Sequence, residues 1–261
     1  MTLFIHEFKT NIRSVLIWSF ALGLSCAFFL LMFKSMQSSL KDMASAYSSM
    51  GAISTAFGLD QISIASLNGY FAIEIGVMHS LGSALFASML GAKMISKEEE
   101  GHTSEFLNTL PFGRNQIIIA KYLLMTVMII LFQCLCFGMY ALAAMLINEH
   151  FSYGMMLTYA LRNGLMMIEL SSVCFLLSSF MKKTQGAAIG LALIAYGMDV
   201  MLRIVTDLKA FRYITPFYYA NASDIFSKIS VKPVILIIAV LVVVASFALA
   251  LVIYHRRDLQ A

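Results

Sequence analysis

The chain has 261 residues, of which 60% are hydrophobic and only 12% are charged, and its formal net charge is +4. A soluble domain carries about 25% charged residues and could not hide this much apolar surface, which excludes a soluble globular protein. The basic residues are scattered between apolar runs, so no nucleic-acid partner is expected. The composition predicts an integral membrane protein.

Six apolar segments are long enough to cross a bilayer as helices, which takes about 20 residues each. They are continuous, whereas the strands of a membrane barrel alternate between apolar and polar residues. The predicted fold class is therefore all-α, a polytopic membrane protein with one transmembrane domain over residues 1–261. The expected spans are 15–34, 69–92, 117–147, 159–180, 186–205 and 234–254.

Three segments outside these spans have a distinct character. Residues 1–14 place apolar side chains at near-helical spacing among polar ones, which predicts an interfacial helix. Residues 35–68 are polar and loop-like, with some amphipathic helical character. Residues 206–233 are rich in Phe and Tyr, which favour the membrane interface, so this segment is predicted to dip into the membrane on the outer side.

Basic residues set the expected orientation, because cytoplasmic loops carry an excess of Lys and Arg. A cytoplasmic N-terminus gives the inner segments a narrow majority of them, and six spans then place both termini in the cytoplasm. The inner basic residues would be Lys9, Arg13, Lys93, Lys97, Arg114, Lys121, Lys182, Lys183, Arg256 and Arg257.

The most charged stretch, residues 95–116, joins the second and third spans. Its three glutamates at 98–100 extend the second helix out of the membrane, and Gly101 interrupts that helix. Thr103 can cap a new short helix with Glu105 in its first turn, and Pro111 ends it. The short helix would present an apolar edge of Phe106, Leu107 and Leu110. This edge either docks into a partner's groove or packs against the membrane as part of a solvated loop.

The strings EEGHTSEFL (99–107) and LPFGR (110–114), followed by Lys121, resemble the cytoplasmic loop of type 2 ABC transporter permeases. His102 departs from the family's Gly-Thr pair. Further similarities are a short basic turn at 181–186, the sequence ITPFY at 214–218 and the ending YHRRDL at 254–259, so the resemblance covers nearly the whole chain.

The resemblance implies a six-span subunit of an exporter in a bacterial cell membrane. Energy would come from a separate ATPase subunit, and two permeases, identical or homologous, would assemble with two ATPases. The cargo would be a hydrophobic drug, an antimicrobial peptide or a lipid. The coupling residues would be Glu98, Glu99, Glu100, Gly101, Thr103, Glu105, Phe106, Leu107, Leu110, Pro111 and Arg114.

The chain has no phosphate-binding loop of the form GxxxxGK[ST], so it is not expected to be an enzyme. It should bind no cofactor, and ATP and Mg²⁺ are expected on the partner ATPase. The cysteines (Cys26, Cys134, Cys136 and Cys174) lie in apolar runs as buried residues, and neither a metal site nor a disulfide is expected.

Ionisable residues inside spans are costly and therefore candidate functional groups. They are Glu74, His79, Glu169, Asp199 and Arg203. Asp199 and Arg203 are four residues apart and can pair on one helix face. Glu74 lies near an outer end and can reach water, whereas Glu169 lies deeper and either lines a pathway or bonds to a neighbouring helix.

Two alternatives to an exporter subunit remain. An intramembrane protease could use the adjacent Glu98 and Glu99, but His79 is the one clear histidine partner within a span. An ion-driven secondary transporter would need spans interrupted by Gly or Pro in matching halves, and this pattern is not evident.

Overall fold

The computed structural model describes residues 2–48, 51, 54–55, 58–59, 61–100, 113–181, 183–205, 211 and 214–256. Within these ranges the chain is helical and contains no strand, which confirms the predicted all-α class. The elements are α1 (Thr2–Ser48), α3 (Leu67–Tyr70), the π-helical turn η1 (Phe71–Ile75), α4 (Gly76–Glu100), α6 (Arg114–Ile147), α7 (Tyr153–Ser178), α8 (Gln185–Ile204), α9 (Ala222–Phe226) and α10 (Pro233–Arg256).

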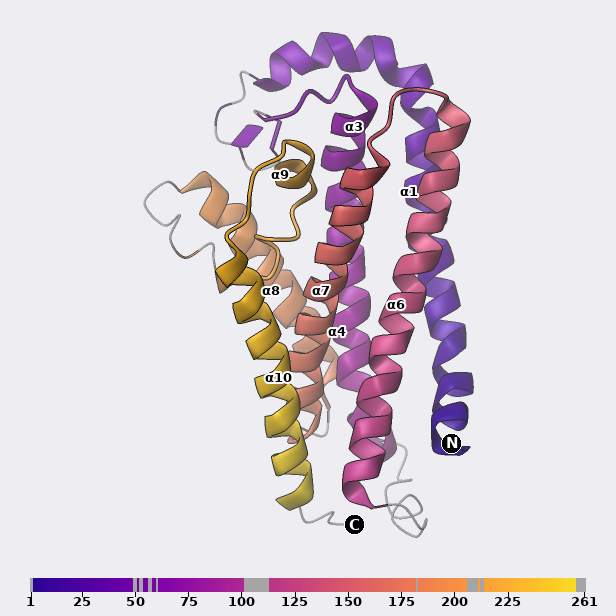
Figure 1. The fold of residues 1–261 in the computed structure, drawn as a ribbon, viewed down its shortest axis with the longest axis vertical. Coiled ribbons are helices and arrows are strands. Elements are labelled where there is room, and N and C mark those ends of the chain that lie inside the picture. Colours follow the sequence, from indigo (N-terminus) through magenta and orange to yellow (C-terminus); the bar gives the residue numbers. More distant parts are fainter. Residues whose placement is uncertain are drawn as a thin grey trace.

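Six helical stretches of the described chain are long and apolar enough to cross a membrane, as predicted. Figure 1 shows them as one elongated bundle in which successive spans run in opposite directions. Both α1 and α10 have their terminal ends at the same end of the bundle, here called the N-terminal end; the opposite end is called the far end. The spans are Glu7–Ala44, Leu67–Lys97, Arg114–Ile147, Tyr153–Ser178, Gln185–Ile204 and Pro233–His255.

Helix α1 joins the predicted helix at 1–14 to the first span and continues well beyond the predicted end of that span. It comprises 47 residues without a break, so there is no boundary between the predicted helix 1–14 and the first span. Of the two features predicted for residues 35–68, helical character is confirmed and a loop is wrong as far as Ser48, because α1 continues to that residue and bends across the far end of the bundle (Figure 1). No proline occurs before residue 111, and the first glycine beyond the predicted end of the span is Gly51, so no strong helix breaker interrupts this stretch.

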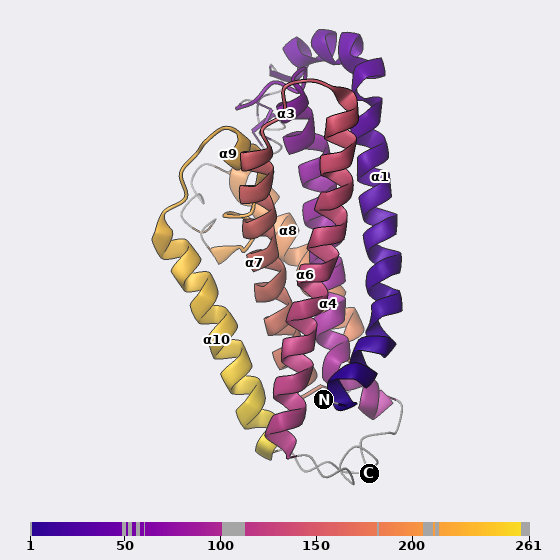
Figure 2. The ribbon, with the colours of Figure 1, turned by 45° about the vertical axis from the view of Figure 1, so that its right-hand side comes forward.

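The spans pack around α4. It contacts α7 and α8 extensively, while α1 packs along α6 and α10 packs along α7 (Figures 1 and 2). Gly91 allows a close approach of α4 to α7, since a Cβ atom there would overlap the backbone carbonyl of Ser171 in α7. Small residues serve this purpose at helix contacts in membranes.

The segment between α8 and α10 folds back against the bundle. Phe217, Tyr219 and all five residues of α9 are buried. Asn221 caps α9 by accepting a hydrogen bond from the backbone N–H of Asp224 at 3.0 Å. Helix α9 packs against α3, η1, α4 and α7, so this short segment closes the bundle near its far end (Figure 1).

Candidate functional site

The predicted coupling segment 95–116 is described at its two stems. The first stem is the end of α4, where residues 98–100 (Glu98, Glu99 and Glu100) are helical, in line with the expected extension of the second span. The second stem begins at Arg114, whose Nη1 donates to the backbone carbonyl of His255 at 3.4 Å. The other predicted coupling residues lie outside the described residues: Gly101, Thr103, Glu105, Phe106, Leu107, Leu110 and Pro111.

A buried carboxylate connects these two stems to α1. Glu7 of α1 is 3% exposed and pairs with lysines from both stem helices. Its Oε1 accepts from Lys121 Nζ of α6 at 2.9 Å, and its Oε2 pairs with Lys97 of α4. The Lys121 ammonium also donates to the carbonyl of Met94 at 2.9 Å. This Glu7 junction ties three helices together where the coupling segment leaves the bundle.

Asn11 lies one helical turn after Glu7 and supports the junction. Its Nδ2 donates to the Glu7 backbone carbonyl at 2.9 Å and to Oε2 at 3.3 Å. The Glu7 carboxylate therefore accepts hydrogen bonds from three side chains. Such multiple hydrogen bonding is what a buried ion pair needs to offset the loss of hydration.

A second polar cluster lies inside the bundle around His79. The His79 Nδ1 atom is 2.9 Å from the Tyr140 hydroxyl, and Nε2 is 3.0 Å from Gln133 Oε1. The Gln133 amide nitrogen donates to Asn163 Oδ1 at 2.8 Å and to the Ala160 carbonyl at 3.3 Å. These contacts join α4, α6 and α7.

The hydrogen-bond partners assign the proton on His79. The Ala160 carbonyl can only accept, so the Gln133 amide nitrogen faces it and Oε1 faces His79. Because Oε1 also only accepts, His79 Nε2 carries the proton, and in the neutral ring Nδ1 accepts from Tyr140. His79 is completely buried and holds helices together.

Glu169 of α7 bonds to the folded-back segment. Its Oε2 accepts from the Tyr219 hydroxyl at 2.6 Å, and the Glu169 side chain is buried. Burial, together with the nearby Glu169 charge, raises the pKa of Tyr219, so the hydroxyl keeps the proton that it donates. The partner of Glu169 is therefore a residue of the segment between α8 and α10.

The predicted pair of Asp199 and Arg203 is present in α8, with Arg203 Nε donating to Asp199 Oδ2 at 2.8 Å. Asp224 of α9 lies 3.8 Å from Arg203 Nη1, and Thr215 donates to Asp199 Oδ1 at 3.2 Å. All four residues are buried. The ion pair thus extends to the folded-back segment and fastens it to α8.

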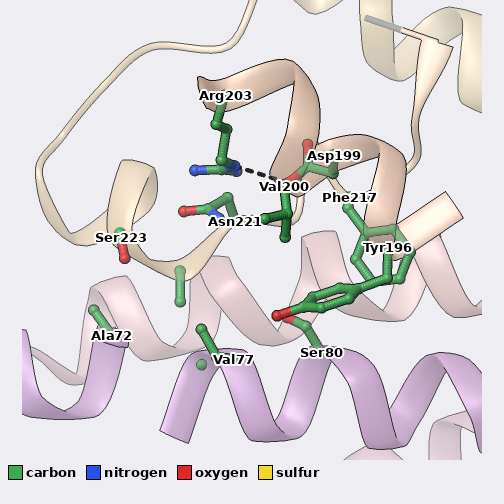
Figure 3. Close-up of a pocket in the computed structure, with 12 residues that line it drawn as sticks. Ala72, Val77, Ser80, Tyr196, Asp199, Val200, Arg203, Phe217, Asn221 and Ser223 are labelled. Atoms are coloured by element: carbon green, nitrogen blue, oxygen red, sulfur yellow. Dashed lines mark hydrogen bonds and ion pairs between the residues drawn. The ribbon is translucent and has the colours of Figure 1, made fainter. Parts of the chain in front are cut away.

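A cavity of about 30 Å³ adjoins this ion pair. Figure 3 shows Asp199 and Arg203 on one side of it and Ser80 of α4 on another. Arg203 Nη2 is buried, and no described residue accepts from it. The volume suits one or two water molecules, which bridge buried polar groups in many proteins, and is too small for a translocation pathway.

Glu74 differs from the other ionisable residues of the spans. It lies in η1 and is exposed. No described residue donates a hydrogen bond to its carboxylate or forms an ion pair with it. Its neighbours Ile73 and Ile75 are buried, so the backbone is fixed while the carboxylate faces outward.

The protease alternative needs a glutamate and a histidine close together. Glu98 follows His79 by 19 residues in the same helix, which separates them by about 28 Å. No group of three or more metal-ligating side chains gathers in the described ranges.

Sequence comparison decides the class of protein. A family model described as ABC-2 family transporter protein matches residues 1–259. The chain belongs to the ABC-2 transporter family. This ABC-2 chain is thus a multi-pass membrane permease subunit of an ABC transporter, and it works with an ATPase subunit. Comparison with curated proteins finds no match.

Several important residues of this ABC-2 permease were not identified from the sequence. Glu7 and Asn11 were counted among the polar residues of an amphipathic helix, and nothing in the local pattern names a partner 114 residues away. Gln133 and Asn163 carry a usable signal, since polar side chains in apolar spans are costly and seek partners. Their interaction with His79 depends on how the three helices pack.

Proposed function

We propose that this ABC-2 permease forms half of an ATP-driven exporter. A second permease, identical or homologous, completes the translocation pathway, and each permease docks one separate ATPase through a cytoplasmic coupling helix within residues 95–116. ATP and Mg²⁺ bind to the ATPase. The cargo is a hydrophobic drug, an antimicrobial peptide or a lipid, moved outward across a bacterial cell membrane.

The observation that supports this proposal most directly is the Glu7 junction. It joins α1 to both stems of the proposed coupling segment through buried charges. A displacement of that segment by an ATPase would therefore reach α1, α4 and α6 together. Packed and ion-paired connections of this kind can carry the effect of a docking event at one end to a pathway through the bundle.

The distribution of charge supports a cytoplasmic N-terminal end. Of the basic residues in the described ranges, eight belong to that end and six to the far end, which is a narrow majority. Cytoplasmic segments of membrane proteins are enriched in Lys and Arg. Both termini would then lie in the cytoplasm, on the same side as the ATPase.

Co-purification tests the docking proposal. The full-length chain, tagged and extracted from its host membrane, should retain an ATPase that contains a GxxxxGK[ST] motif, identified by mass spectrometry. Phe106→Asp and Leu107→Asp should each remove that ATPase, because a carboxylate would be buried in the docking groove.

The matched control is Ile229→Asp, which places the same charge on an exposed residue between α9 and α10. This variant should retain the ATPase. The docking proposal is contradicted if no ATPase accompanies the wild-type chain, or if Phe106→Asp and Leu107→Asp retain it at the wild-type level.

A further inference from the structure

The central helix of the bundle leaves one stripe uncovered. A larger share of the span Leu67–Lys97 is buried within the chain than of any other span. It contacts α1, α6, α7 and α8. Four of its apolar side chains nevertheless remain partly exposed, and Glu74 is exposed. The four are Met78, Leu81, Leu85 and Met89. These five residues, spaced three or four apart on one continuous helical stretch, are called the α4 stripe.

The α4 stripe lies between two helices that do not pack against each other. Helix α1 reaches α4 through contacts such as Trp18 with Phe86, whose ring centroids are 6.0 Å apart. On the other side, α8 packs against α4 near Gln185, whose side chain donates to the Met89 carbonyl at 3.4 Å. The described chain therefore borders the α4 stripe on two sides without covering it.

Glu74 cannot simply face lipid at this position. It lies seven residues inside the span that begins at Leu67, or about 10 Å along the helix axis. An ionised carboxylate in the hydrocarbon region is costly unless it meets a cation or water. Unlike Glu169 and Asp199, Glu74 has no partner among the described residues.

The backbone at Glu74 is also unusual. Residues 71–75 form a π-helical turn, a rare element that often occurs at functional sites. The other four residues of the α4 stripe are methionines and leucines. Methionine side chains are flexible and polarisable, and they are common on surfaces that accept varied apolar ligands.

We propose that the α4 stripe binds an amphipathic cation, with the Glu74 carboxylate pairing with its charge and the Met and Leu side chains contacting its apolar body. This inference rests on the proposed exporter function and gives the chemical class of its cargo. Charge complementarity favours this occupant, because a carboxylate at the end of an apolar stripe matches a ligand that carries one positive charge on an apolar body.

Binding of two ions of the same shape tests the proposal. The full-length chain in lipid nanodiscs is titrated with radiolabelled tetraphenylphosphonium, and in parallel with tetraphenylborate, its negatively charged counterpart. Binding to empty nanodiscs is subtracted. The wild-type chain should bind the cation saturably and the anion at least about tenfold more weakly.

Glu74→Gln keeps the side-chain shape and removes the charge, so it should weaken binding of the cation by about tenfold or more. Glu74→Asp should retain most of the affinity. Leu81→Ala removes apolar contact from the α4 stripe and should weaken binding by about tenfold. Glu149→Gln, which neutralises a carboxylate outside the α4 stripe, is the matched control and should leave binding unchanged.

Equal binding of both ions, or unaltered cation binding by Glu74→Gln, overturns the proposal. If Glu74→Gln instead dissociates a dimer in light scattering while cation binding is retained, the α4 stripe is a subunit interface and the proposal fails.

These measurements need no ATPase. If an ATPase co-purifies but the cation is not bound, the cargo inference alone fails, whereas absence of the ATPase contradicts the exporter function.

Discussion

Glu7 of α1 and Lys121 of α6 form a buried ion pair with 2.9 Å between Oε1 and Nζ, although 114 residues separate them in the sequence. Lys121 is 1% exposed, and its ammonium pairs with Glu7 and donates to the Met94 carbonyl. A buried charge that loses its partner is far more costly than a surface charge that does so. This relationship makes the Glu7 junction a sensitive point of the N-terminal end.

Replacing Glu7 by glutamine should destabilise the permease strongly. The change removes the Glu7 carboxylate from the buried Lys121 ammonium, and breaking a buried ion pair in this way costs about 3–5 kcal/mol. The measurement is thermal unfolding of the detergent-solubilised chain, followed by the fluorescence of its single tryptophan, Trp18, which packs against Phe86.

The double variant Glu7→Gln with Lys121→Met should recover much of the lost stability, because an apolar side chain of similar length then replaces the buried ammonium. Lys93→Met, an exposed lysine on α4, is the control and should have little effect. A wild-type unfolding temperature for Glu7→Gln would contradict the structural importance of the junction.

Removing the hydroxyl of Tyr219 should loosen the folded-back segment. Tyr219→Phe leaves the buried Glu169 carboxylate without its 2.6 Å donor, at a cost of about 1–3 kcal/mol. Hydrogen exchange of residues 214–226 should become faster. Tyr153→Phe, the same change at an exposed tyrosine of α7, should have a smaller effect, and equal exchange in both variants would show that the Glu169 bond does not hold the segment.

Two glycines should respond oppositely to the same substitution. Gly91→Ala places a Cβ atom against the Ser171 carbonyl and should destabilise the chain by about 1–3 kcal/mol. Gly190→Ala points into open space within α8, and alanine favours a helix over glycine by about 1 kcal/mol, so this variant should be neutral or more stable. Thermal unfolding of both variants is the measurement. An equal loss of stability in the two variants would contradict the close contact of α4 with α7.

His79→Leu should destabilise the bundle without creating a charge. It removes the His79 donor from Gln133 Oε1 and the His79 acceptor from the Tyr140 hydroxyl, at about 1–3 kcal/mol for each buried group. Cys134→Leu is the control for thermal unfolding, because Cys134 is exposed on α6, contrary to the expectation that all four cysteines are buried. A His79→Leu variant as stable as the control would mean that the buried polar network contributes little.

Prediction from the sequence worked where local properties decide the outcome. The apolar runs defined six spans, and the i, i+4 spacing of Asp199 and Arg203 indicated their ion pair. It failed at the extent of α1, since the polar residues after Lys34 suggested a loop although no proline or glycine stops the helix before Gly51. Polarity shows where a chain leaves the hydrocarbon region, and it does not show where a helix ends.

The sequence by itself determined the membrane class, the number of spans and the resemblance of the loop at 95–116, because these depend on composition, run length and local motifs. Only the tertiary structure decided the partners of the polar residues: Glu7 with Lys97 and Lys121, His79 with Gln133 and Tyr140, and Glu169 with Tyr219. The physical reason is that a buried polar group must find a partner wherever packing brings one, across any distance in the sequence. The same packing left Glu74 without a partner among the described residues, on a helix whose residues otherwise lie mostly inside the bundle.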